Sequence, residues 1–311
     1  MKKTLLLVLA CLLLTSCRFA QRPAETPLAT PQPGATSPAN STPDASPASL
    51  PPMYDIRYSD ESAADPKSLS LDLYRVEQPN APVMVYVHGG GWRRGNKSNV
   101  DAKPAGFNGQ GFIFVSVNYR FIPEVDVTQE VRDVTKAIDW VHDNIASYGG
   151  DPDRIFLMGH SAGAHLVSLI GTDGSYLEAE GMSLADIKGV ISLDTEAYNL
   201  PVLMPTLLSD RGVYPSTFGS EPNLWKAMSP QLHVAAEKNI PSFVIAYTGK
   251  REERAAFSEN FQNALNEAGV PTLLIPATNK THGQINEEFG LTDDPVTQKI
   301  FKWLDTILKG L

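Results

Sequence analysis

Apolar residues in this chain fall into short continuous runs and into longer stretches where they recur every three or four positions. The runs at 83–87 and 112–117 do not alternate with polar residues, which is typical of strands buried on both faces of a sheet. Two leading segments, 54–58 and 68–74, also have strand character, the second with regular alternation. Further runs of this kind lie at 154–158, 189–193, 242–247 and 271–275.

Amphipathic stretches with helical spacing separate these runs. The stretch before the strand at 154–158 ends at Gly149 and Gly150, and the one before 271–275 ends at Gly269, as helices commonly do. Alternation of strand and helix predicts an α/β fold with a mostly parallel sheet, helices on both faces, and ligands at the carboxyl ends of the strands. The apolar positions that define the helices are Val131, Val134, Ile138, Val141 and Ile145; Phe257, Phe261, Leu265 and Ala268; and Val296, Ile300, Leu304 and Ile307.

The first 52 residues do not follow this pattern. Two lysines precede a leucine-rich run of about ten residues, which is typical of an export signal and too short to span a bilayer. Residues 18–52 consist mainly of Pro, Ala, Thr and Ser, so they predict an extended tether that buries little apolar surface. We therefore expect a signal at 1–16, a tether at 17–52 and one α/β domain at 53–311.

Residues 14–17 read LTSC, which resembles the lipobox of bacterial lipoproteins. In those proteins the cysteine is lipidated and becomes the first residue of the mature chain, so the resemblance implies lipidation at Cys17. An ordinary signal peptide is the alternative, although a small-x-small cleavage site is not evident. The resemblance implies a lipid anchor in a membrane of the cell envelope, and Arg18 favours the outer membrane or the cell surface.

Charge and cysteine content narrow the classes of function. The 26 basic and 35 acidic residues give a net charge of -9 without any basic block, which argues against nucleic acid as a partner. Cys11 lies in the signal and Cys17 at the lipidation position, so the domain has no thiol, disulfide or cysteine metal site. Because no metal cluster, phosphate loop or dinucleotide motif is present, the sequence predicts no metal and no cofactor.

The strand at 154–158 leads into GHSAG at 159–163, and an apolar segment at 164–170 predicts a buried helix. In a Gly-x-Ser-x-Gly elbow the serine sits on a strained turn, and its neighbours are small because backbone approaches closely. This context predicts that Ser161 is a nucleophile at the carboxyl end of its strand. A structural glycine-rich turn is the alternative.

A second glycine-rich motif, HGGGW at 88–92, directly follows the strand at 83–87. Serine attack on an ester generates a tetrahedral oxyanion, which backbone N–H groups already aimed at it stabilise without reorganising. A loop free of side chains can turn its N–H groups into the cleft, although an ordinary glycine turn is the alternative. We interpret His88 as a brace for this loop, and Trp92 either shapes the cleft entrance or belongs to the core.

From about residue 69 to residue 282 the chain resembles an α/β-hydrolase of the HGGG esterase kind. Besides the two motifs above, it has NYR at 118–120, YGGDPDRI at 148–155 and THG at 281–283, in the same order. The resemblance is closest to the branch that holds feruloyl and acetyl-xylan esterase-like and kynurenine formamidase-like proteins. It implies the α/β-hydrolase fold with a small cap and assigns the oxyanion hole to Gly90, Gly91 and Ala162.

A serine nucleophile requires a base that takes its proton, a task that suits an imidazole near neutral pH. Among the 6 histidines, His282 lies in a polar loop directly after the last predicted strand. The order serine, acid, histidine along the chain places the base of this fold there.

The acid of the triad departs from the family pattern, because the loop after the strand at 242–247 reads TGKREERAAF and contains no Asp. Glu253 fits relatives with an Arg-x-Asp arrangement in this loop, and Glu252 fits those with Gly-x-x-Asp. Asp194, at the end of the preceding strand, is a third candidate. Glu253 is the preferred one, although either glutamate also suits a solvated charge in the first turn of a helix.

Residues 194–241 show no clear element, and relatives have a small cap at this point. Tyr198 and Trp225 are therefore candidate substrate contacts together with Trp92, although each also suits core packing. The sequence predicts a serine carboxylic ester hydrolase that acts through an acyl-enzyme on small-molecule or carbohydrate esters with short acyl groups. An arylformamidase-like amide hydrolase and a non-catalytic envelope lipoprotein of this fold are the alternatives.

Overall fold

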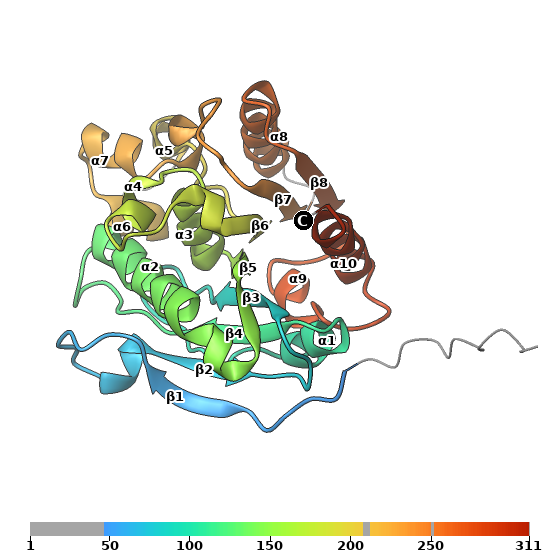
Figure 1. Ribbon diagram of the computed structural model, residues 1–311. Helices are drawn as coiled ribbons and strands as arrows, with labels where there is room; N and C mark the ends of the chain where they lie inside the picture. Colours follow the sequence, from blue (N-terminus) through green and yellow to red (C-terminus); the bar gives the residue numbers. More distant parts are fainter. Residues whose placement is uncertain (1–46, 208–211, 250–251, 311) are drawn as a thin grey trace, which may run out of the picture. The chain divides into compact units, whose positions relative to one another are not determined.

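The computed structural model describes residues 47–207, 212–249 and 252–310. This part of the chain contains an 8-stranded sheet in the order β1-β2-β4-β3-β5-β6-β7-β8 (Figure 1). The pairs β1–β2 and β2–β4 are antiparallel, and all other neighbours are parallel, so the predicted mostly parallel sheet is confirmed. The strands are β1 Met53–Arg57, β2 Ser70–Tyr74, β3 Ala81–Val87, β4 Ile113–Val117, β5 Gly150–His160, β6 Ile187–Leu193, β7 Ser242–Thr248 and β8 Thr272–Ala277.

Helices cover both faces of this sheet, as the alternating pattern predicts. Alternate residues of β3 show the two faces: Val83 and Val85 pack in one hydrophobic cluster with α2, α3 and α8, whereas Met84 and Tyr86 pack in a second with α1 and α10. The longer helices are α1 Lys103–Gly109, α2 Val127–Asn144, α3 Ala162–Ile170, α8 Glu252–Glu267 and α10 Pro295–Leu308. The shorter ones are α4 Ser175–Glu178, α5 Leu200–Leu203, α6 Val213–Phe218, α7 Pro222–Ala227 and α9 Gln284–Glu287.

Elements β2 and α1 differ from the sequence-based expectation. The strand expected from residue 68 begins at Ser70, because Pro66–Leu69 forms a 3-10 turn that the Asp65 side chain caps by accepting from the Lys67 amide. Helix α1 escaped prediction because it contains Pro and Gly, which are weak helix formers. Its Gly106 is required by close packing, since a Cβ atom there would lie 2.7 Å from the Gly290 backbone.

The segment without predicted elements, 194–241, contains the short helices α5, α6 and α7, which gather at one side of the sheet (Figure 1). Phe218 at the end of α6 has no exposed surface and packs edge-on against Trp92, with ring centroids 5.0 Å apart. This segment therefore packs on the glycine-rich loop after β3, as a small cap would.

Residues 1–46 lie outside the described part of the chain, and with them the expected signal, the lipidation position Cys17 and most of the tether. The division into signal, tether and domain stays a prediction. Among the described residues, none of the helices is both long and apolar enough to cross a membrane.

Candidate active site

Ser161 lies between β5 and α3 on a strained turn, with a φ of 55° and a ψ of -117°. Positive φ is costly for a residue with a Cβ atom and persists only where the surroundings enforce it. Backbone crowding does so here: a Cβ atom on Gly159 would lie 2.2 Å from the Gly163 oxygen, and one on Gly163 would lie 2.1 Å from the Val87 oxygen. The serine is therefore held at the carboxyl end of β5, as the elbow motif predicts.

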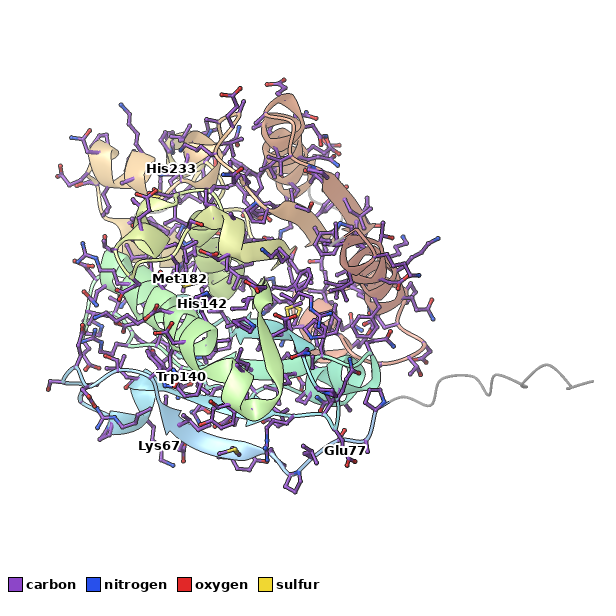
Figure 2. The ribbon with its side chains drawn as sticks, in the orientation of Figure 1. Lys67, Glu77, Trp140, His142, Met182 and His233 are labelled. Atoms are coloured by element: carbon purple, nitrogen blue, oxygen red, sulfur yellow. The ribbon has the colours of Figure 1, made fainter. Side chains whose placement is uncertain are left out.

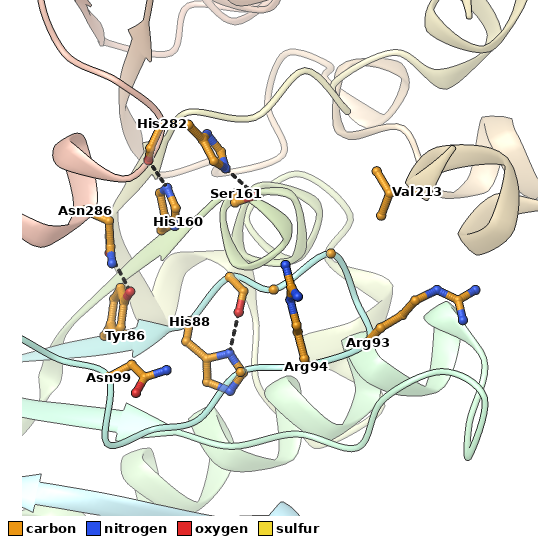
Figure 3. A pocket seen from close by; sticks show the side chains of 14 residues that line it. Tyr86, His88, Arg93, Arg94, Asn99, His160, Ser161, Val213, His282 and Asn286 are labelled. Atoms are coloured by element: carbon orange, nitrogen blue, oxygen red, sulfur yellow. Dashed lines mark hydrogen bonds between the residues drawn. The ribbon is translucent and has the colours of Figure 1, made fainter. Parts of the chain in front are cut away.

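His282, in the loop after β8, faces this serine (Figure 3). The Ser161 hydroxyl donates to its Nε2, with 2.9 Å between Oγ and Nε2. The Nδ1–H of the ring donates to Asp194 Oδ2 across 2.6 Å. The structure thus brings together a hydroxyl, an imidazole and a carboxylate in the relay order of a serine hydrolase.

Asp194 follows β6 directly, and its side chain has no exposed surface. Its Oδ1 accepts from the Thr248 amide at 2.8 Å, and its Oδ2 accepts from the Thr248 hydroxyl at 2.6 Å and from Arg254 at 2.9 Å. Burial alone would raise the pKa of Asp194, but the bonds from His282 and Thr248 and the charge of Arg254 hold that pKa below its usual range. The ionised carboxylate fixes the imidazole with its proton on Nδ1.

The expectation that Glu253 or Glu252 holds the histidine is wrong. Both residues lie exposed in the first turn of α8, where the macrodipole favours acidic side chains. Arg254, the next residue, turns inward to Asp194, and Asp194 occupies the single Nδ1–H of His282. The third candidate, Asp194, is therefore the residue that completes the arrangement.

The HGGGW loop after β3 lies beside Ser161. Gly90 and Gly91 adopt φ values of 139° and 63°, and a Cβ atom on Gly90 would lie 1.7 Å from the Arg94 oxygen, so this turn excludes a side chain. Both glycines line a cavity together with Ser161, and Ala162 at the start of α3 lines the cavity next to it. These positions suit the oxyanion role, which stays a prediction.

His88 braces this loop. Its ring stacks on Tyr119 with centroids 4.8 Å apart, and the Tyr119 hydroxyl donates to the His88 backbone oxygen across 3.0 Å. Burial lowers the pKa of His88 to about 4, so its ring is neutral near pH 7. A buried neutral ring that packs behind the glycine loop has the role of a brace.

Two cavities meet at Ser161. The large cavity has a volume of about 760 Å³ and the small cavity about 240 Å³. Both are lined by Gly91, Ser161, Val213 and His282. The large cavity is otherwise lined by Tyr86, His88, Gly89, Gly90, Arg93, Arg94, Gly95, Asn99, His160 and Asn286, and the small cavity by Trp92, Ala162, Asp194, Thr195, Glu196, Tyr214 and Arg254.

Of the three aromatic residues expected to contact substrate, Trp92 alone lies at these cavities. Tyr198 is fully buried, stacks on Phe261 at 4.4 Å and bonds to Ser192 with 2.7 Å between the hydroxyl oxygens, so it is a core residue. Trp225 lines a separate hollow of about 420 Å³ beside α6, so its predicted substrate contact at the triad is also wrong.

His160 is a site residue that sequence reasoning did not identify. It lies beside Ser161, and its Nε2–H donates to the His282 backbone oxygen across 2.8 Å. Burial and the adjacent His282 ring lower the pKa of His160 to about 3, which keeps the ring neutral. The position of His160 next to Ser161 could have indicated this role, because a side chain beside the nucleophile lies close to the catalytic base.

Two other histidines, His142 and His233, do not line the cavities at Ser161. Figure 2 shows His142 on α2 and His233 near the short helices; their ring nitrogens contact Asp143 and the Ala227 oxygen, respectively. Within 47–207, 212–249 and 252–310, no group of three or more His, Cys, Asp and Glu residues is placed to hold a metal ion.

Several known proteins with similar sequences are named as esterases. The family model described as BD-FAE matches residues 71–197. The chain is 35% identical over 219 residues to esterase LipQ of Mycobacterium tuberculosis, covering 65% of this chain and 51% of that protein. It is 30% identical over 230 residues to isoprenylcysteine alpha-carbonyl methylesterase ICME of Arabidopsis thaliana, covering 68% and 53%. The chain thus spans about half the length of the curated relatives it matches.

Solved structures show the fold. A truncated carbohydrate esterase from gut microbiota matches with a TM-score of 0.70 at 19% identity, over 85% of this chain and 98% of that one. Apo Thermogutta terrifontis esterase 2 matches with a TM-score of 0.64 at 25% identity, over 86% and 96%. The chain has the α/β-hydrolase fold. The mostly parallel sheet with helices on both faces and the serine elbow after β5 are those that the resemblance implies, so the expected fold is confirmed.

We expect Asp194→Asn to slow labelling of Ser161 by a fluorophosphonate by about a thousandfold, because an amide does not fix the tautomer and orientation of the imidazole. Mass spectrometry measures the labelling rate, and circular dichroism checks that the variant is folded. Glu253→Gln and Glu252→Gln are matched controls and should stay within about twofold of the wild type. Loss of labelling in a glutamate variant, with Asp194→Asn unaffected, would contradict the assignment.

Proposed function

We propose that this chain is a serine carboxylic ester hydrolase that works through an acyl-enzyme. The observation that supports it most directly is the chain of hydrogen bonds from Ser161 through His282 to Asp194, with 2.9 Å and 2.6 Å between the bonded atoms. Its similarity to proteins named as esterases supports the same reaction. No bound group is needed for this chemistry, because nucleophile, base and carboxylate are side chains.

The geometry gives each residue one task in the acylation step. His282 Nε2 takes the hydroxyl proton as Ser161 Oγ bonds to the carbonyl carbon of the ester, and Asp194 stabilises the imidazolium that forms. The carbonyl oxygen becomes the oxyanion, and we expect the amides of Gly90, Gly91 and Ala162 to stabilise it, since all three residues line the cavities at Ser161. The C–O bond then breaks, and His282 gives its proton to the leaving alcohol.

Water completes the cycle in the second half of the reaction. His282 takes a proton from a water molecule that attacks the acyl-enzyme, and then returns it to Ser161 Oγ as the acid product leaves. Ser161 is half-buried and His282 is exposed at the large cavity, so water can reach the acyl carbon.

Replacing the nucleophile tests the proposal. We expect Ser161→Ala to lower turnover of para-nitrophenyl acetate by about a millionfold, because the acyl-enzyme cannot form. Circular dichroism should show an unchanged fold, since alanine removes a single oxygen. An alanine variant that retained a tenth of the activity, or a wild type that no fluorophosphonate labels, would refute a serine mechanism at this site.

The small cavity supports a preference for short acyl groups. Its volume of about 240 Å³ is bounded by Trp92, Tyr214 and the salt bridge between Arg254 and Glu196, so it offers no long apolar channel. We expect kcat/KM for para-nitrophenyl esters to stop rising beyond about four acyl carbons, because further methylene groups find no apolar surface to bury. A higher kcat/KM for laurate than for butyrate would show that such a channel exists.

We further propose that the chain is exported and anchored by a lipid at Cys17, in the outer membrane or at the cell surface. The support is the basic start, the short apolar run and the LTSC sequence at 14–17. We expect a fatty-acid analogue to label the wild type but not Cys17→Ser in a bacterial host, with the wild type in the membrane fraction. An unlabelled wild type would favour an ordinary signal peptide.

A further inference from the structure

The large cavity has a positively charged lining in an acidic protein. Arg93 and Arg94 line it, whereas none of its lining residues within the described part of the chain is Asp or Glu. The chain as a whole has a net charge of -9. The overall charge of the protein therefore repels an anionic group, whereas the two arginines at this cavity attract it.

The two arginines differ in what they contact. The guanidinium of Arg93 donates to the Ser216 backbone oxygen across 2.7 Å and is directed to α6. Figure 3 shows Arg94 rising from the loop toward Ser161, away from the direction that Arg93 takes. Within the described residues, the guanidinium of Arg94 has no hydrogen bond or ion pair.

The backbone at Arg94 is held close to the oxyanion loop. A Cβ atom on Gly90 would lie 1.7 Å from the Arg94 oxygen and 3.2 Å from its Cγ, so the base of this side chain packs on Gly90. An exposed arginine commonly pairs with a nearby carboxylate, but among the described residues no acid lines this cavity. The five N–H donors of Arg94 are thus available to a bound molecule whose ester lies at Ser161.

We propose that Arg94 makes this enzyme selective for esters whose alcohol part bears a carboxylate. The inference rests on the proposed ester hydrolysis. The planar guanidinium matches a carboxylate with two parallel hydrogen bonds, which gives orientation as well as affinity. The acyl group is assigned to the small cavity of about 240 Å³, which leaves the large cavity of about 760 Å³, and with it Arg94, to the alcohol part.

Two matched substrates test this selectivity: para-acetoxybenzoate, which bears the carboxylate on its alcohol part, and para-acetoxybenzamide, which is its neutral counterpart. We expect Arg94→Gln to lower kcat/KM for the benzoate by about tenfold or more, and for the benzamide by less than about twofold. Arg94→Lys should fall between, because lysine retains the charge but not the fork. Arg132→Gln, an exposed change on α2 outside both cavities, controls for the loss of one positive charge.

An equal loss on both substrates, or no loss on either, would overturn the proposal. The proposal would also be overturned if the enzyme preferred a carboxylate on the acyl part only. This preference is measured by comparing para-nitrophenyl hydrogen adipate, whose acyl part bears a carboxylate, with the neutral para-nitrophenyl hexanoate. Binding is measured without turnover as the slowing of fluorophosphonate labelling of Ser161 by benzoate or benzamide themselves, which carry no ester. We expect benzoate to protect Ser161 better than benzamide does, and Arg94→Gln to abolish the difference. A wild type that is labelled but shows no such difference refutes selectivity alone, whereas one that is never labelled refutes the ester hydrolase itself.

Discussion

The carboxylate of Asp194 has no exposed surface, yet it is ionised and accepts hydrogen bonds from three separate segments. Thr248 at the end of β7, Arg254 in the first turn of α8 and His282 after β8 all donate to it. A buried charge is tolerated only when it is paired and hydrogen-bonded, so these three donors are a condition of its presence. The bond from His282 also holds the histidine in place. The contacts that stabilise the fold at the carboxyl edge of the sheet are therefore the same contacts that set the catalytic geometry.

Backbone packing couples the nucleophile to the oxyanion loop. Gly163 lies against the Val87 oxygen, and a Cβ atom on Gly89 would lie 2.8 Å from the His160 oxygen and 3.0 Å from the Ser161 Cβ atom. The end of β3 and the elbow after β5 therefore pack so closely that no Cβ atom fits at these glycines. The strained φ of Ser161 is maintained by this contact, and the amides beside it need little reorganisation when charge develops on the substrate.

Much of this arrangement could be predicted from the sequence because its strands are buried on both faces, which leaves continuous apolar runs that end at the active edge. Ser161 and His282 were identifiable, since each lies in the turn or loop that follows such a run. The acid was not, because β6 and β7 end at the same edge of the sheet and acidic residues follow both strands in the sequence. The inward turn of Arg254 decides between them, and this depends on the packing of α8. Burial of Tyr198 under Phe261 is likewise a tertiary contact that composition does not reveal.

The fixed charges of the triad are largely compensated within the protein. Asp194 pairs with Arg254 and His282, and Arg254 also pairs with Glu196 at 2.8 Å. Arg93 and Arg94 in the loop after β3 form no salt bridge among the described residues, and both line the large cavity. Because Arg94 is exposed, water and salt screen its charge beyond contact distance, and its influence on the oxyanion is weak. A group in direct contact with Arg94 is held equally before and during the reaction, and binding of that kind lowers KM without raising kcat. Catalytic power and substrate choice are thus separated in this site: buried pairs at the strand ends provide the first, and an exposed loop charge provides the second.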